Sequence, residues 1–157
     1  MSILHSPFEA QRDPDQPQFE LEGWIDSAPF EDLLEMTIES AEAGRARLRM
    51  PFLVKHAQGG GVMHGGALTS LADTAVAMAI KSLLPPESFF ATTELTMRFL
   101  ASVKQGEVIA EAVVHGPEGR TFIGEADLIN DGVTVATFRS VFKLRRPKGA
   151  GDDAQAV

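Results

Sequence analysis

The sequence predicts one α+β domain that combines an antiparallel sheet with a single long helix. Apolar residues recur at helical spacing over only one long stretch, residues 65–84. Four segments with the pattern of strands follow that stretch, and short turn-forming sequences connect them. Because strands that are joined by tight turns run in opposite directions, the sheet is expected to be antiparallel.

The segment before the long helix is expected to supply a short helix and a hairpin. The short helix is predicted at residues 24–36, with Pro29 near its first turn. Two strands, residues 37–43 and 45–51, flank Gly44. In the second strand arginine alternates with other residues, which predicts one solvated face.

The long helix and the later strands are predicted from the spacing of apolar residues and from the proline- and glycine-containing segments between them. One arc of the helix is apolar, and Pro85-Pro86 ends it. The next segments are rich in β-branched residues or alternate in polarity, and the turn sequences Gly116–Gly119 and Asn130–Gly132 separate the last three. The expected strands are residues 89–100, 106–115, 121–130 and 133–144.

Length and composition limit the number of domains and the classes of binding partner that the chain can have. A length of 157 residues is typical of one domain, here predicted at 26–145. A proline-rich N-terminal extension at 1–25 is expected to be irregular, and a tail at 146–157 to be flexible. The net charge of −8 argues against binding to nucleic acid or to an anionic membrane. Since there is neither cysteine nor a signal pattern, and no apolar stretch is long enough to span a bilayer, a cytoplasmic location is expected.

The run Gly-Gly-Gly-Val-Met-His-Gly-Gly at residues 59–66 is the main functional signal. It delivers His64 and two glycines to the start of the long helix, where free backbone N–H groups can bind an anion. Asp73 then lies among alanines and leucines of that helix, where a carboxylate is costly to bury. An oxyanion site together with a base or nucleophile indicates acyl transfer.

These residues resemble the motif of the hotdog-fold acyl-CoA thioesterases, in particular the phenylacetate-degradation (4-hydroxybenzoyl-CoA thioesterase-like) subgroup. The motif is Gln58, then His64-Gly65-Gly66, then Asp73, and the similarity covers roughly residues 30–144. The resemblance implies a sheet wrapped around one central helix. It also implies hydrolysis of an acyl-CoA thioester at a site shared between two subunits, with CoA arriving as part of the substrate and no other cofactor.

The resemblance implies a role for each motif residue. Asp73 matches the catalytic carboxylate, acting as nucleophile or as general base on water, and Gly65 matches the residue whose N–H polarises the thioester carbonyl. Gln58 matches an amide that orients water or the carbonyl, and His64 a residue that shapes the loop and the first helical turn. Thr92 or Thr93 matches a strand position where some members place a hydroxyl that assists the attacking water.

One departure concerns the position one turn after the carboxylate, where some relatives have a hydroxyl and this chain has Ala77. The hydroxyl role is therefore expected at Thr92, Thr93 or Ser70. Substrate contacts are also expected at Gly66 and Ser70. For the phosphates of CoA, arginine forks are suitable, and Arg120, Arg145 and Arg146 are the candidates.

Helix geometry predicts a dimer independently of the resemblance. Gly65 and Asp73 are eight residues apart on one helix, so about 12 Å separates them along its axis. Reacting groups must lie within roughly 3–3.5 Å of one another. The carboxylate of one copy is therefore expected to meet the glycine N–H of another, with two antiparallel helices side by side. The resemblance further implies a homotetramer.

Other interpretations of the same residues remain open from sequence alone. Asp73 can be a structural residue bonded to the backbone or to Lys81, and His56 and His115 are expected at the surface, without the spacing of metal ligands. Two other functions also fit: an acyl-CoA sensor without turnover, and a hydroxyacyl thioester dehydratase, which needs a histidine base that this chain does not pair with Asp73. The acyl group is not specified, because its candidate lining residues are as typical of a core: Met63, Phe89, Phe90, Met97 and Phe99.

Overall fold

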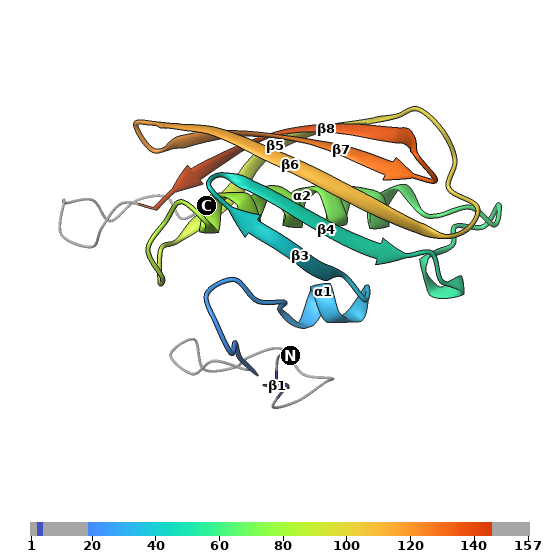
Figure 1. Cartoon of the computed structure of the whole chain (residues 1–157), viewed down its shortest axis with the longest axis horizontal. Coiled ribbons are helices and arrows are strands. Elements are labelled where there is room, and N and C mark those ends of the chain that lie inside the picture. Colours follow the sequence, from blue (N-terminus) through green and yellow to red (C-terminus); the bar gives the residue numbers. More distant parts are fainter. Residues whose placement is uncertain (1–2, 5–18, 146–157) are drawn as a thin grey trace.

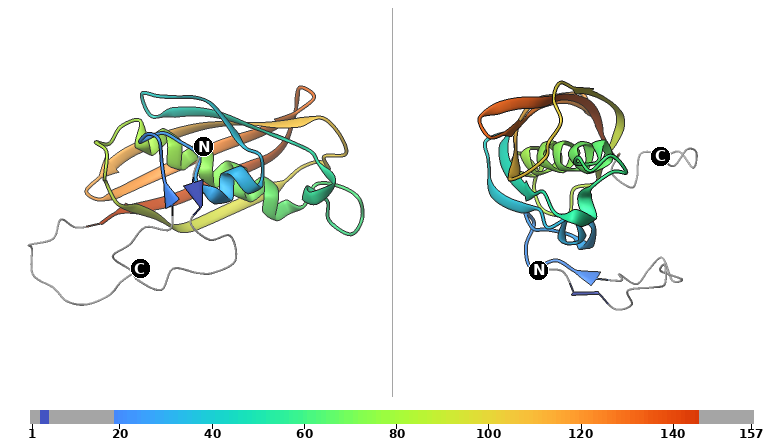
Figure 2. Two further views of the ribbon diagram at one scale, coloured as in Figure 1. Left: turned by 90° about the horizontal axis from the view of Figure 1, so that it is seen from below. Right: turned by 90° about the vertical axis from the view of Figure 1, so that its right-hand side faces the viewer.

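The computed structural model describes residues 3–4 and 19–145, and its architecture is a six-stranded antiparallel sheet curved around one long helix (Figure 1). Across the sheet the strands lie in the order β3 (Thr37–Glu42), β4 (Arg45–Pro51), β6 (Glu107–Glu118), β7 (Thr121–Asn130), β8 (Val133–Leu144) and β5 (Phe90–Phe99). Helix α2 (Gly65–Lys81) runs along the concave side of the sheet, as the end-on view in Figure 2 shows. The predicted fold class and the wrapped arrangement are confirmed.

The core lies between α2 and the inward-facing residues of the sheet. Leu71, Ala75 and Val76 of the helix have no exposed surface, and neither does Phe122 of β7. The backbone of β7 approaches the helix closely at Gly124, because a side-chain carbon at that position would lie only 2.1 Å from a methyl carbon of Val76. Burial on this scale fixes which face of α2 turns inward, and it leaves one stripe of the helix partly exposed.

That stripe carries Asp73, Gly66, Ser70 and Ala77, none of which is fully buried. They fall within an arc of about 60° on a helical wheel with 3.6 residues per turn. The side chains on this stripe are small, so the backbone of another segment can approach it closely. The stripe borders β5, which is an edge strand of the sheet.

The N-terminal segment differs from the prediction. Strand β1 (Ile3–Leu4) pairs with β2 (Phe19–Glu20), so part of the extension expected to be irregular forms a small sheet. Helix α1 (Pro29–Leu33) is much shorter than the expected helix at 24–36, because proline occupies its first turn and Glu35 has a positive φ of 56° just beyond its end. The predicted tail, 146–157, lies outside the described residues.

The turn predicted at 116–119 is also placed differently. β6 continues through Gly116 and Pro117 to Glu118, which pairs with Thr121, and the register shifts between His115 and Glu118. The irregularity that these residues encode is therefore a bulge inside the hairpin, and the turn itself lies at Gly119 and Arg120. The turn predicted between β7 and β8 at 130–132 is confirmed.

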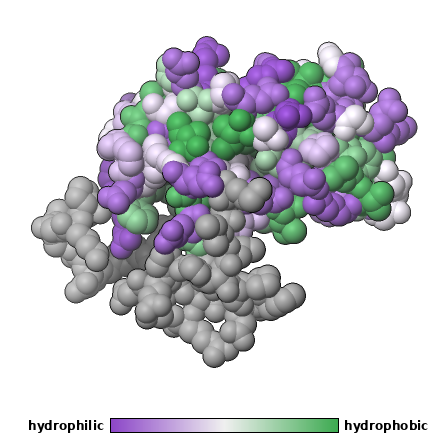
Figure 3. All heavy atoms as spheres, turned by 60° about the horizontal axis from the view of Figure 1, so that its bottom comes forward, coloured by the Kyte–Doolittle hydropathy of each residue, from purple (hydrophilic) through white to green (hydrophobic). Residues whose placement is uncertain are grey.

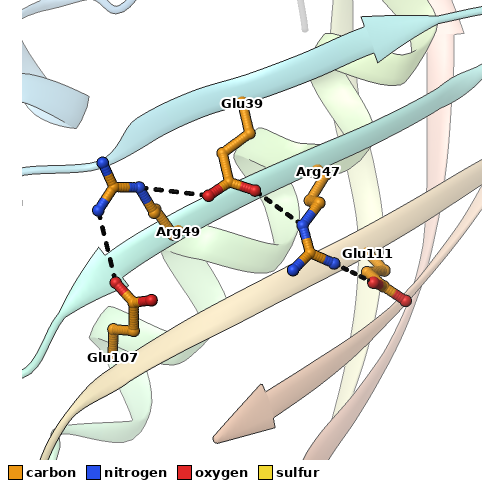
Figure 4. Close-up of polar contacts among 5 residues, drawn as sticks. All are labelled: Glu39, Arg47, Arg49, Glu107 and Glu111. Carbon is orange, nitrogen blue, oxygen red and sulfur yellow. Dashed lines mark hydrogen bonds and ion pairs between the residues drawn. The ribbon is translucent and has the colours of Figure 1, made fainter.

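The convex face of β3, β4 and β6 carries a row of ion pairs, shown in Figure 4. Arg47 contacts Glu39 at 2.7 Å and also Glu111, while Arg49 contacts Glu39 at 3.3 Å and Glu107 at 3.5 Å. All five side chains are substantially solvent-accessible, so each pair adds at most about 1 kcal/mol to stability. The alternating arginines thus mark a solvated face, as predicted.

On the face seen in Figure 3, which is turned toward the side of α1, hydrophobic residues lie between hydrophilic ones. Several large apolar side chains are more than half exposed, among them Phe30 and Leu33 of α1 and Phe99 of β5. Among the described residues, no helix has the length and apolar character needed to cross a bilayer.

Candidate active site

The motif His64-Gly65-Gly66 forms the beginning of α2. His64 is the N-cap residue, with extended backbone angles, and its ring atom Nδ1 accepts a hydrogen bond of 2.8 Å from the Gly66 N–H. A methyl group at position 66 would lie 2.9 Å from that nitrogen, so the capping ring requires glycine there. Histidine takes the place of the more usual serine, threonine or aspartate cap.

The Gly65 N–H is left without a partner. It belongs to the first helical residue and so has no acceptor within the helix, and within residues 19–145 no other group accepts it. The ring of Phe99 covers the Cα side of Gly65, because a methyl group there would lie 3.0 Å from ring atom Cζ. The His64 ring therefore accounts for glycine at position 66, and the Phe99 ring for glycine at position 65. Of the two glycine N–H groups, only that of Gly65 is left to bind a ligand.

Asp73 lies two turns further along the helix and has a hydroxyl as its partner. The Oγ1 hydroxyl of Thr92, on β5, donates a hydrogen bond of 2.8 Å to Oδ1 of Asp73. Burial raises the pKa of the Asp73 carboxyl above its ordinary value, and the Thr92 hydrogen bond partly opposes this effect. No cation within residues 19–145 forms an ion pair with Asp73.

The alternative partner for Asp73, Lys81, is engaged elsewhere. Its ammonium lies 4.8 Å from the centre of the Trp24 ring, and its carbonyl accepts a hydrogen bond of 3.0 Å from the Trp24 indole N–H. Burial lowers the pKa of Lys81, while Glu31 and Asp26 act in the opposite direction. A carboxylate that is partly buried, uncompensated by a cation and bonded to a single hydroxyl is typical of a reactive group.

A β-bulge in β5 positions both Thr92 and Phe99. Thr92 pairs with Phe142 and Glu94 with Val141, so Thr93 is an extra residue. Residues seven apart in a regular strand lie on opposite faces. Because the bulge shifts the alternation by one, both Thr92 and Phe99 face α2, the first opposite buried Phe142 and the second opposite buried Ala136.

The loop that precedes α2 is tied down at both ends. The Met63 N–H donates to Val103 and the His64 N–H donates to the carbonyl of His56, at 2.9 and 2.7 Å. Gln58 is exposed on this loop, and its side-chain oxygen accepts from the Gly60 N–H, so within the described chain no hydrogen bond joins it to Asp73. Within its own chain, the Gln58 side-chain oxygen is therefore engaged inside the loop.

His56 contradicts the prediction of a surface position. It is only 2% exposed, its Nδ1 lies 2.8 Å from the carbonyl of Pro51, and its Nε2 is buried without a partner. Its short helical turn, Val54–His56, turns the chain from β4 into the loop. Burial of the ring anchors the loop, whereas His115, as predicted, is exposed and lies 3.4 Å from Glu125.

The remaining predicted substrate contacts are dispersed. The Ser70 hydroxyl donates to the carbonyl of Gly66 at 2.7 Å, and the Thr93 hydroxyl donates to the carbonyl of Val141 at 3.2 Å, so neither reaches Asp73. Arg120 donates to the Leu144 carbonyl at 3.2 Å, and the Arg145 guanidinium lies 5.8 Å from the centre of the Phe89 ring. Arg146 lies outside the described residues.

One chain therefore presents two separate half-sites on α2. The first is the free Gly65 N–H beside Phe99, and the second is the Asp73 carboxylate beside Thr92. Both residues belong to one uninterrupted helix, so about 12 Å separates them along its axis. Neither half-site alone contains both an oxyanion donor and a base.

Two positioning features were missed by sequence reasoning. Phe99 was one of five candidate lining residues of the acyl pocket, but its position over Gly65 depends on how β5 folds against α2 and was not predicted. The buried His56 had a weaker signal, its position two residues after the apolar Phe52-Leu53-Val54 and three residues before the glycine-rich run.

Comparison with known proteins agrees with this architecture. The family model of the thioesterase superfamily matches residues 60–137. The Halobacterium salinarum protein named "Putative esterase VNG_1336C" is 33% identical over an alignment of 146 residues, and the alignment covers 85% of this chain and 96% of that protein.

Solved structures share the fold over most of their length. A conserved protein of Pseudomonas aeruginosa, PA5202, superposes with a TM-score of 0.73 at 28% identity, covering 76% of this chain and 95% of that one. A mutant of the phenylacetic acid degradation protein PaaI from Thermus thermophilus superposes with a TM-score of 0.69 at 26% identity, covering 76% and 100%. The chain therefore belongs to the thioesterase superfamily and has its hotdog fold.

Proposed function

We propose that this protein hydrolyses acyl-CoA thioesters to a free acid and CoA, at two equivalent sites formed between two copies of the chain. Membership of the thioesterase superfamily supports thioester hydrolysis in general. The observation that carries the proposal is the partly buried Asp73 carboxylate, whose pKa is raised by burial and whose bonded partner is the Thr92 hydroxyl.

The reaction needs a donor for the carbonyl oxygen and a carboxylate for the attacking water. The Gly65 N–H, at the positive end of the α2 dipole, would bind the carbonyl oxygen and stabilise the negative charge that develops on it. As a general base, Asp73 would take a proton from water while the new C–O bond forms. The C–S bond then breaks, and the thiolate of CoA leaves and is protonated.

A second route uses Asp73 as the nucleophile. Its carboxylate would attack the carbonyl carbon, expel the thiolate and form an anhydride, which water then hydrolyses. Both routes give the same products, and both need the ionised carboxylate. Thiolate is a good leaving group, so one carboxylate without a serine triad is chemically sufficient.

A dimer with two-fold symmetry would complete the site. Antiparallel packing of two α2 helices brings the Gly65 half-site of one chain to the Asp73 half-site of the other, and does so twice. Two features support this packing: the small residues of the α2 stripe, and the inward-facing Leu95 of edge strand β5, which is 42% exposed. A homotetramer, formed from two such dimers, is the larger assembly that the resemblance implies.

We place the CoA phosphates near Arg120 and Arg145. Thr92 pairs with Phe142, only three residues before Arg145, which corresponds to roughly 10 Å along a strand. The Arg145 N–H bonds to the Phe89 carbonyl at 2.8 Å, so this arginine extends from the end of the sheet where Thr92 lies. Arginine forks at that end would bind phosphate oxygens.

The direct test is release of free thiol from a panel of acyl-CoA esters. The purified protein is expected to release CoA from at least one of them, and Asp73→Asn is expected to retain binding of that ester while hydrolysis is lost. Binding of acyl-CoA without thiol release from any ester would favour a sensor. Water addition to or loss from a hydroxyacyl-CoA, without thiol release, would favour a dehydratase.

Replacing Thr92 by valine is predicted to shift the pH dependence of hydrolysis. The Thr92 hydrogen bond lowers the pKa of Asp73, so its removal should move the acid limb of kcat/KM to higher pH. At a fixed pH near that limb we expect kcat/KM to fall roughly tenfold or more, because a hydrogen bond to a charged group contributes about 1.5–3 kcal/mol. Thr93→Val is the matched control, since that hydroxyl bonds to the Val141 carbonyl. An unchanged limb in Thr92→Val would exclude this role.

A further inference from the structure

The ring of Phe99 occupies an unusual place for an aromatic side chain on the helix-facing side of the sheet. Its tip contacts the first residue of α2, with ring atoms Cζ and Cε1 lying 3.0 and 3.2 Å from where a methyl group of residue 65 would be. Phe99 as a whole residue is nevertheless 55% exposed, whereas Phe138 and Phe142, on the inward face of neighbouring β8, are only 3% and 2% exposed. Its tip is therefore held against the helix, while much of the ring is not covered by its own chain.

The backbone fixes this position. Phe99 is the last residue of β5 and pairs with Ala136, and the N–H groups of Leu100 and Ala101 both donate to the carbonyl of Val135, at 2.8 and 3.1 Å. The absence of a side chain at Gly65 allows the close approach. An apolar ring on a hydrogen-bonded stretch of backbone thus stands next to the unpartnered Gly65 N–H.

We infer that Phe99 is a specificity-determining residue, forming the wall that limits the size of the acyl group next to the thioester carbonyl. This inference rests on the proposed function. A carbonyl oxygen bound by the Gly65 N–H lies about 3 Å from that nitrogen, so an acyl group held there lies in the neighbourhood of the ring that contacts the same residue. The occupant of the exposed ring surface is then the apolar acyl chain, which gains free energy by leaving water.

The ratio of kcat/KM for a bulky acyl-CoA to kcat/KM for a small one tests this inference. With benzoyl-CoA and acetyl-CoA as the pair, Phe99→Ala is expected to raise the ratio at least tenfold. Tenfold is the low end of the discrimination in kcat/KM that one extra or missing carbon produces in an apolar pocket. Phe99→Leu keeps an apolar wall, so its ratio should lie between those of wild type and Phe99→Ala. Phe30→Ala is the matched control, because Phe30 is 53% exposed but belongs to α1, and its ratio should equal that of wild type.

A merely structural role for Phe99 predicts a different result. If the ring only covers the first turn of α2, Phe99→Ala would lower kcat/KM for both esters by the same factor and lower the melting temperature, and the inference would be overturned.

Binding separates this inference from the proposed function. The affinities of non-hydrolysable thioether analogues of the two esters are measured by calorimetry for wild type and Phe99→Ala. If the wild type releases no thiol but Phe99→Ala shifts the relative affinity toward the bulky analogue, the hydrolase proposal fails and the role of Phe99 stands. If the wild type hydrolyses esters and neither ratio changes, the role of Phe99 fails and the hydrolase proposal stands.

Discussion

Replacing Asp73 by asparagine is expected to lower kcat for thioester hydrolysis by roughly 10²–10⁴-fold, the range for loss of a general base. Asparagine has nearly the same shape and keeps an oxygen that can accept the Thr92 hydrogen bond, so the geometry of the site should be preserved. The carboxylate is lost, and with it the group that removes a proton from water. The measurement is thiol release under saturating substrate.

The same substitution is expected to stabilise the protein at neutral pH. The folded chain holds the Asp73 pKa above the usual 3.8, so it binds a proton more readily than the unfolded chain does. Stability contributed by this group therefore falls as the pH rises from 3.8 through the raised folded value, and at pH 7 the whole cost of a desolvated carboxylate is present. Asp73→Asn removes that cost.

Melting temperatures at pH 7 and at a pH below 3.8 check this expectation. The variant should melt above wild type at pH 7, and the difference should shrink at the acidic pH, where the wild-type carboxyl is protonated in both states. Lost activity combined with gained stability is typical of a catalytic residue. A variant that keeps full activity, or that is destabilised at pH 7, would indicate a structural carboxylate.

Replacing Gly65 by proline is expected to lower kcat by roughly 10²–10³-fold, because proline has no N–H to bind the carbonyl oxygen. The position tolerates proline unusually well. Gly65 is the first helical residue, where proline is favoured, and His64 has φ −64° and ψ 133°, angles compatible with a residue that precedes proline. The helix should therefore persist, as the far-UV circular dichroism spectrum would show.

Gly65→Ala is the control for the added side chain. Alanine keeps the N–H, and its methyl group meets only the tip of the Phe99 ring at 3.0 Å, which a shift of a few tenths of an ångström relieves. We expect it to cost less than tenfold in kcat. Equal losses in the alanine and proline variants would mean that the side chain, and not the missing N–H, is responsible.

Local sequence signals predicted the parts of the structure that depend on local interactions. The start of α2 at Gly65 follows from the glycine-rich loop, and the β7–β8 turn follows from Asn130-Asp131-Gly132. The eight-residue spacing of Gly65 and Asp73 was also enough to show that one chain cannot supply both groups. These conclusions need only helix geometry and turn chemistry.

The choice between Thr92 and Thr93 needed information that the sequence does not carry locally. In an unbroken strand, Thr93 would share a face with Phe99, and Thr92 would point away from the helix. The bulge at Thr93 reverses this, and its position depends on pairing with β8, about 50 residues away in the chain. For the same reason, the contact of Phe99 with Gly65 and the burial of His56 appear only once the sheet is assembled.

The central claim, that each site takes its N–H from one chain and its carboxylate from another, is tested most directly by mixing two inactive variants. Asp73→Asn and Gly65→Pro carry different tags, are co-expressed, and the heterodimer is isolated by both tags. Its two shared sites differ: one combines the intact Gly65 with the intact Asp73, and the other contains both defects. We predict that the heterodimer regains about half of the wild-type activity per dimer. A heterodimer as inactive as its two parents would contradict a shared site.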